Sequence, residues 1–203
     1  MPGAAHQPVA VITGASSGIG KAAARQLAAR GWHVIAQGRN PGRMATAEAE
    51  IQSAAPGARV DMIRGDLSLL SETARMANEI RNLTDRVHLL LNNAGGVRAG
   101  MVITAEGNEA TFAGNHLGHF LLTNRLLPCL RAAASEALLN LEHTYSVSLF
   151  DRVSNKLALN ASGHTLRKDA ENLRAHCLSF EEKLLNHTDV GHIRVGASFT
   201  IGN

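Results

Sequence analysis

A glycine-rich segment near the amino terminus, Thr13 to Gly20, has residue types and a spacing that suit phosphate binding. Glycines in such a turn remove the Cβ atoms that would keep a pyrophosphate away from backbone N–H groups. An apolar run precedes the segment and an Ala-rich run follows it, which indicates a strand, a turn and a helix whose amino terminus attracts anions. A tight turn needed only for packing would use the same residues. We predict that the pyrophosphate of a dinucleotide is bound by Gly14, Ser16, Ser17, Gly18, Ile19 and Gly20.

The residues after the second predicted strand indicate which dinucleotide is bound. A carboxylate at this place binds the ribose 2′-hydroxyl of NAD, whereas a basic residue pairs with the 2′-phosphate of NADP. The sequence has Gly38-Arg39-Asn40 there, with Arg43 close by and without a carboxylate. Arg39 therefore favours NADP as the cofactor. The alternative interpretation of Arg39 is a solvent-exposed arginine on a loop.

Strand-like and helix-like segments alternate along the first 131 residues. The strand ranges are 9–12, 33–37, 59–64 and 87–91, and the helix ranges are 21–30, 42–53, 71–83 and 106–131. Parallel strands joined by right-handed helical crossovers form a sheet that is covered on both faces. We therefore predict an α/β fold in which residues 1–131 form an incomplete, Rossmann-like, doubly wound parallel sheet.

Four motifs follow one another in this part of the chain, namely Thr13–Gly20, Gly65-Asp66-Leu67, Asn92-Asn93-Ala94-Gly95 and Asn115–Phe120. In this order they closely resemble the short-chain dehydrogenase/reductase family, and the segment around Asn115 is most similar to its retinol-dehydrogenase-like branch. The resemblance implies an NADP-dependent oxidoreductase of alcohols or ketones. It also implies that Asp66 and Leu67 lie near the adenine, that Asn93, Ala94 and Gly95 line the cofactor cleft, and that Asn115 belongs to the catalytic group.

The proton-transferring pair of that family is incomplete in this sequence. The family uses a tyrosine whose pKa is lowered by a lysine four residues later, because a phenol with a pKa near 10 needs a nearby cation to work at neutral pH. The chain has one tyrosine, Tyr145, and the residue four positions later is Leu149. Lys156 follows only eleven residues after Tyr145. We therefore expect cofactor binding with impaired catalysis.

The alternation of strands and helices stops after residue 131, where we place a boundary. Residues 133–143 are predicted to form a helix and residues 149–160 a hairpin around Ser154-Asn155. The segment 132–160 resembles part of the winged helix of LysR-type transcriptional regulators, and residues 188–203 resemble the start of a further, truncated domain. The chain is thus interpreted as a chimeric sequence joined near residue 131. A DNA-binding regulator fragment is the alternative function, with weak DNA binding because the supporting helix is absent.

A heptad pattern marks residues 161–187 as a long linker helix, with Asn160 as its N-cap. Apolar residues recur at spacings of four and three and form a seam of Leu166, Ala170, Leu173, Cys177, Phe180 and Leu184. Pairing of two such helices would bury the seam, so we predict a homodimer through residues 161–185. The alternative is packing of the same seam within one chain.

The composition excludes several classes of protein. With 45% hydrophobic and 18% charged residues and a net charge of +3, the sequence is typical of a globular protein without a basic arm for nucleic acid. It has no apolar run of membrane-spanning length, so we expect no membrane partner. The two cysteines, Cys129 and Cys177, have no spacing that suits a metal site, and they indicate a reducing cytoplasm.

Overall fold

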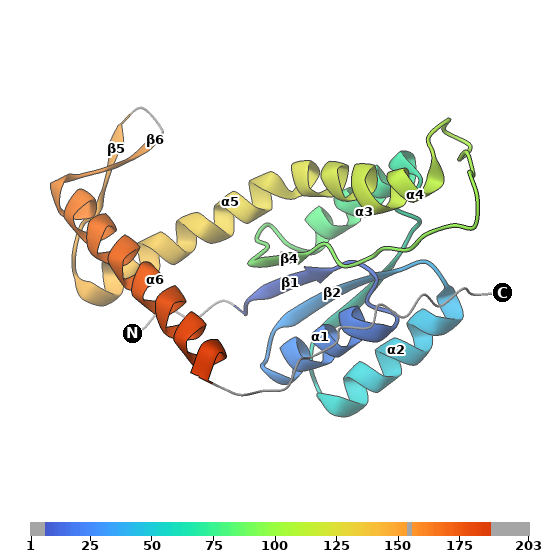
Figure 1. The fold of residues 1–203 in the computed structure, drawn as a ribbon, viewed down its shortest axis with the longest axis horizontal. Coiled ribbons are helices and arrows are strands. Elements are labelled where there is room, and N and C mark those ends of the chain that lie inside the picture. The colour runs from blue at the N-terminus through green and yellow to red at the C-terminus, as the bar shows by residue number, and fades with distance from the viewer. Residues whose placement is uncertain (1–6, 154–155, 188–203) are drawn as a thin grey trace. The chain divides into compact units, whose positions relative to one another are not determined.

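The computed structural model describes residues 7–153 and 156–187 (Figure 1). The predicted truncated domain at 188–203 lies outside these residues. The chain forms two compact units, one that ends at Leu139 and one that begins at Asn140.

The first unit contains a parallel sheet of four strands (Figure 1), whose bounds are β1 Val9–Ile12, β2 His33–Gly38, β3 Val60–Arg64 and β4 Leu89–Leu91. The strand order is β3-β2-β1-β4. In the register, Val11 lies between Ile35 of β2 and Leu90 of β4. All three pairings are parallel, so the predicted α/β, Rossmann-like sheet is confirmed.

Helices cover both faces of this sheet because side chains alternate along each strand. On one face, α1 (Gly18–Ala29) and α2 (Pro41–Ala54) pack against Ile12 and Val34. On the other face, α3 (Leu70–Leu83) and the first half of α5 (Gly118–Tyr145) pack against Val11 and Ile35. The two hydrophobic clusters hold β1 in the centre of the sheet, and Figure 1 shows α1 and α2 on the side opposite α3 and α5.

The helical region before and after residue 131 differs from the prediction. Instead of one helix over 106–131, the structure has a short α4 (Ala110–Phe112), a π-helical turn η1 (Ala113–Leu117) and then α5. The α5 helix continues through 131 to Tyr145, so the expected separate helix at 133–143 is part of it. The Ala-rich segment 132–134 explains the continuity, because alanine has the highest helix propensity.

The second unit contains an antiparallel hairpin and a long helix. Strands β5 (Phe150–Val153) and β6 (Lys156–Leu159) pair with Phe150 opposite Leu159, which confirms the predicted hairpin. Helix α6 spans Ala161–His187, and the Asn160 side chain caps it by accepting a 2.9 Å hydrogen bond from the Gly163 N–H, as predicted. A winged helix is not shown by these elements and stays a prediction. None of the helices in the described ranges has the length and apolar composition to cross a membrane.

Candidate functional site

The glycine turn lies at the carboxyl end of β1, where it leads into α1. Gly14 and Gly18 have φ angles of +66° and +54°, which side chains rarely adopt. A Cβ on Gly14 would lie 2.8 Å from the Ala94 Cα, and a Cβ on Gly20 would lie 2.5 Å from the Gly14 carbonyl oxygen. The amide groups in the first turn of an α-helix have no partner inside the helix. The turn therefore combines close backbone approach with free donors, which suits a pyrophosphate.

Gln37 fixes this turn to the sheet, although the sequence analysis assigned it no role. Its Oε1 accepts a 3.0 Å hydrogen bond from the Gly14 N–H, and its Nε2 donates a 2.7 Å bond to the Gly65 carbonyl. The Gln37 carbonyl also accepts a 2.9 Å bond from the Ala15 N–H. The residue is only 5% exposed. A polar side chain within an apolar strand was the available signal, because buried polar groups need partners.

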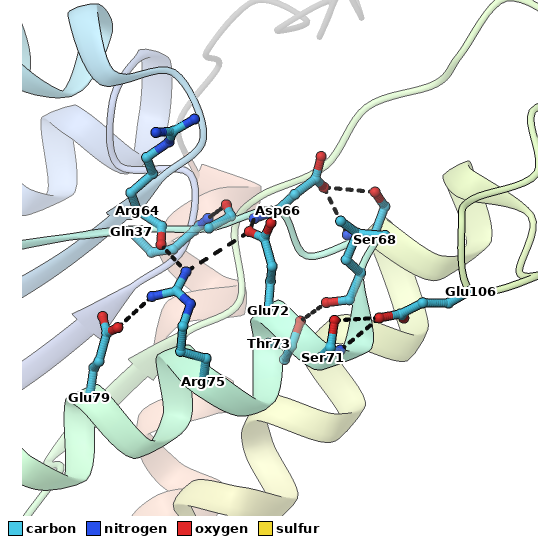
Figure 2. Close-up of polar contacts among 12 residues, drawn as sticks. Gln37, Arg64, Asp66, Ser68, Ser71, Glu72, Thr73, Arg75, Glu79 and Glu106 are labelled. Atoms are coloured by element: carbon cyan, nitrogen blue, oxygen red, sulfur yellow. Dashed lines mark hydrogen bonds and ion pairs between the residues drawn. The ribbon is translucent and has the colours of Figure 1, made fainter.

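Arg39 and Asp66 meet at the same edge of the sheet, after β2 and β3. The Arg39 Nη1 lies 3.5 Å from the Asp66 Oδ2, and the Arg39 side chain is 65% exposed. The other Asp66 oxygen accepts bonds of 2.9 and 2.7 Å from the N–H and hydroxyl of Ser68, which Figure 2 shows. Burial disfavours the charged carboxylate, but the Ser68 bonds and Arg39 outweigh it and lower the pKa of Asp66 below its ordinary value. The Leu67 side chain is buried in the core.

The loop after β4 is joined to the end of β1 through Thr13. The Thr13 hydroxyl oxygen accepts hydrogen bonds from the N–H groups of Asn93 at 2.9 Å and Ala94 at 3.0 Å. The Asn93 side chain donates a 3.0 Å bond back to the Thr13 carbonyl. Asn93 and Ala94 thus lie beside the glycine turn, and Gly95 follows them in the loop.

Asn115 lies in the π-helical turn and holds the same loop from the other side. Its Oδ1 accepts a 3.0 Å bond from the Gly96 N–H, and its Nδ2 donates a 2.9 Å bond to the Gly96 carbonyl. Turns of this kind are frequent at functional sites. The structure therefore brings Asn115, the loop 93–96 and the glycine turn into one hydrogen-bonded group.

Tyr145 does not belong to that group. It is the last residue of α5, in the second unit, and its side chain is 72% exposed. Leu149, four residues later, is buried. The local structure therefore gives Tyr145 no cation at the position of the family's lysine. Within the described ranges, no group of three His, Cys, Asp or Glu side chains could hold a metal ion.

Comparison with known proteins gives a family match over most of the chain. A model described as short chain dehydrogenase matches residues 8–168. Short-chain dehydrogenase TIC 32 A, chloroplastic, of Brassica napus is 36% identical over 157 residues, which cover 72% of this chain and 49% of the relative. Retinol dehydrogenase 13 of Homo sapiens is 39% identical over 131 residues, 64% of this chain and 40% of the relative. The chain spans half or less of the length of these relatives.

Solved structures agree with this match. The short-chain dehydrogenase from Sphingobium yanoikuyae in complex with NADPH is 31% identical, with a TM-score of 0.52, over 60% of this chain and 47% of that chain. A metagenomic short-chain oxidoreductase in complex with NADP is 33% identical, with a TM-score of 0.52. The match covers 60% of this chain and 55% of that chain. The comparisons give no support to the resemblance to LysR-type regulators, and the family match passes residue 131.

Proposed function

Because the chain belongs to the short-chain dehydrogenase family, we propose that its first unit binds NADP(H) at the carboxyl edge of the parallel sheet. One observation carries the proposal: the glycine turn follows β1 and Arg39 follows β2, and these two strands are neighbours in the sheet. Ile12 and Ala36 are paired in the register of β1 and β2, so the segments after both strands share one edge. Dinucleotides bind at this edge of Rossmann-like sheets.

The 2′-phosphate is assigned to Arg39. Its present contact with Asp66 is long, at 3.5 Å, and exposed, so the ion pair contributes little to stability. A guanidinium can exchange such a partner for a phosphate, which it can bind through two parallel N–H groups. The similar structures that hold NADPH and NADP support this choice of cofactor.

The remaining roles follow the family pattern. Ser16, Ser17, Gly18 and Ile19 form the turn that receives the pyrophosphate, and Asp66 and Leu67 lie toward the adenine. Asn93, Ala94 and Gly95 line the cofactor cleft, and Asn115 belongs to the catalytic group. When bound, the reduced cofactor supplies a hydride for a carbonyl substrate. This chain's own residues hold the dinucleotide, but Tyr145 lacks the cation that would prepare it as a proton donor, so we propose little turnover of alcohols or ketones.

Calorimetry with the purified chain tests the cofactor assignment. We expect NADPH to bind at least about ten-fold more tightly than NADH, since one charge-assisted contact to a phosphate is worth at least about 1.4 kcal/mol. Equal affinities, or tighter binding of NADH, would contradict the assignment of the 2′-phosphate to Arg39.

Self-association through α6 is a second proposal, which concerns the partner of the second unit. In the seam of this helix, Leu166 is 43% and Leu173 is 65% exposed, and Ala170 and Cys177 are exposed too. Burying each large apolar side chain contributes roughly 1.5 to 3 kcal/mol, which favours pairing with a second copy. Sedimentation of the parent and of Leu173→Asp is the test. We expect the parent to be a dimer and the Leu173→Asp variant to be a monomer. A monomeric parent would refute the dimer.

DNA binding through residues 132–160 and a cytoplasmic location stay predictions from the sequence. The described contacts favour neither over the NADP(H) site. A mobility shift on a palindromic DNA site that is lost in Arg152→Ala would favour the regulator alternative.

A further inference from the structure

A buried histidine, His119, connects the two sides of the proposed site. It is the second residue of α5 and is 8% exposed. Its Nε2 lies 3.0 Å from the Thr13 hydroxyl oxygen, and its Nδ1 lies 3.2 Å from the backbone carbonyl oxygen of Asn115. The imidazole therefore spans the end of β1 and the π-helical turn.

The donors and acceptors around Thr13 determine which ring nitrogen carries the proton. A threonine hydroxyl has one hydrogen to donate and two lone pairs to accept with. The backbone N–H groups of Asn93 and Ala94 can only donate, and they lie 2.9 and 3.0 Å from this oxygen. The single Asn93 hydrogen is shared with the Leu91 carbonyl oxygen, which lies 3.0 Å from the same nitrogen, so the Ala94 N–H fills one Thr13 lone pair and the Asn93 N–H fills part of the other.

Two acceptors lie within reach of the Thr13 hydroxyl hydrogen: the Leu91 carbonyl at 3.3 Å and the His119 Nε2 at 3.0 Å. The Leu91 carbonyl already accepts bonds of 3.0 Å from the N–H groups of Thr13 and Asn93. The Asn115 carbonyl beside Nδ1 can only accept, so this contact needs a proton on Nδ1 and leaves the Nε2 of a neutral ring to accept the Thr13 hydroxyl hydrogen. The proton of a neutral imidazole then lies on Nδ1, where it is donated to the Asn115 carbonyl.

We propose that His119 is a positioning residue, a neutral imidazole with its proton on Nδ1, that closes a ring of hydrogen bonds around the cofactor edge. The ring runs from Thr13 to the Ala94 N–H, along the chain to Gly96, through the Asn115 side chain and back through His119. It holds the loop 93–96 in place before the dinucleotide arrives, which reduces the ordering cost of binding. The binding part of this inference rests on the proposed NADP(H) site.

Three variants distinguish the two hydrogen bonds of the His119 ring, one to Thr13 and one to the Asn115 carbonyl. In His119→Gln the amide oxygen reaches the position of Nε2 and accepts from Thr13, whereas in His119→Asn the shorter amide reaches only the Asn115 carbonyl. His119→Leu loses both bonds. We expect the dissociation constant for NADPH to rise about ten-fold or more in His119→Leu and to rise less in the other two variants, which each keep one bond of the ring. His116→Leu, at an exposed site of the same motif, is the matched control and should bind as the parent does.

Nitrogen-15 NMR of the histidine side chains tests the tautomer without any cofactor. The resonances of His119, identified by their loss in His119→Gln, should show a protonated Nδ1 and an unprotonated Nε2 at neutral pH. Thermal melting identifies any variant that fails to fold. A proton on Nε2, or NADPH binding by a folded His119→Leu as tight as in the parent, overturns the inference. A parent that binds no NADPH overturns the proposed function and the positioning role, while the NMR result still decides the tautomer.

Discussion

The carboxyl edge of the sheet and the region around Tyr145 differ in how their polar groups are held. At the edge, Thr13 and Gln37 are buried and hydrogen-bonded to loops that lie far away in the sequence. Around Tyr145, the tyrosine is exposed and its neighbour four residues later is a buried leucine. The first region has polar groups that are fixed by hydrogen bonds, and the second has a tyrosine without a cation four residues later. The proposed cofactor binding therefore depends on the first region alone.

The largest effect should come from filling the glycine turn. Gly14→Ala forces a side chain to φ +66° and places its Cβ against the Ala94 backbone. A left-handed conformation alone costs about 1–2 kcal/mol, so we expect a loss of at least about 2 kcal/mol of unfolding free energy, together with NADPH binding. Gly57→Ala is the control, because Gly57 has φ +80° with open space around it. Equal losses of unfolding free energy and intact NADPH binding in both variants would show that the close contact of Gly14 with Ala94 affects neither stability nor binding.

Gln37→Leu should have the next largest effect, because it leaves the Gly14 N–H and the Gly65 carbonyl without their buried partner. Each such group costs about 1–3 kcal/mol, so for the two groups together denaturant unfolding should show a loss of at least about 2 kcal/mol. Gln52→Leu replaces an exposed glutamine of α2 and should change stability by less than about 0.5 kcal/mol. Similar losses of unfolding free energy in the two variants would show that the Gln37 side chain does not stabilise the glycine turn.

Arg39→Asp should reverse the cofactor preference. A carboxylate at this place repels the 2′-phosphate and accepts from the 2′-hydroxyl, so NADPH should bind at least about ten-fold more weakly and NADH no more weakly than in the parent. Arg30→Asp makes the same charge change at the far end of α1 and should leave both affinities unchanged. An unchanged NADPH affinity in Arg39→Asp would mean that Arg39 is only a solvent-exposed residue.

A smaller effect is expected in the pH dependence of stability. Because the folded-state pKa of Asp66 is lowered, its carboxylate stabilises the fold above the ordinary value of 3.8, and this contribution is lost as the pH falls through the folded-state pKa. Asp66→Asn should therefore flatten the acid limb of an unfolding curve as the pH falls below about 3.8. An unaltered limb in Asp66→Asn would argue against the Ser68 and Arg39 contacts.

The sheet could be predicted from the sequence because its strands are short, apolar, β-branched runs between helix-forming segments. The π-helical turn could not, since it depends on packing: a Cβ on Gly118 would lie 2.3 Å from the Leu67 carbonyl, 51 positions away. The motifs predict the glycine turn and Asn115 as site residues. Gln37 and His119 were missed as site residues because their partners, Gly65 and Thr13, become neighbours only after folding.

The most direct test measures NADPH binding and hydride transfer with one preparation of the chain. Calorimetry should give saturable NADPH binding, while NADPH oxidation with a panel of aldehydes and ketones should stay at the rate of a protein-free blank. We expect Tyr145→Phe to change neither result, because the 72% exposed phenol is not among the residues proposed to bind the dinucleotide. Absence of NADPH binding, or steady oxidation that Tyr145→Phe abolishes, would contradict the account of a cofactor site separate from catalysis.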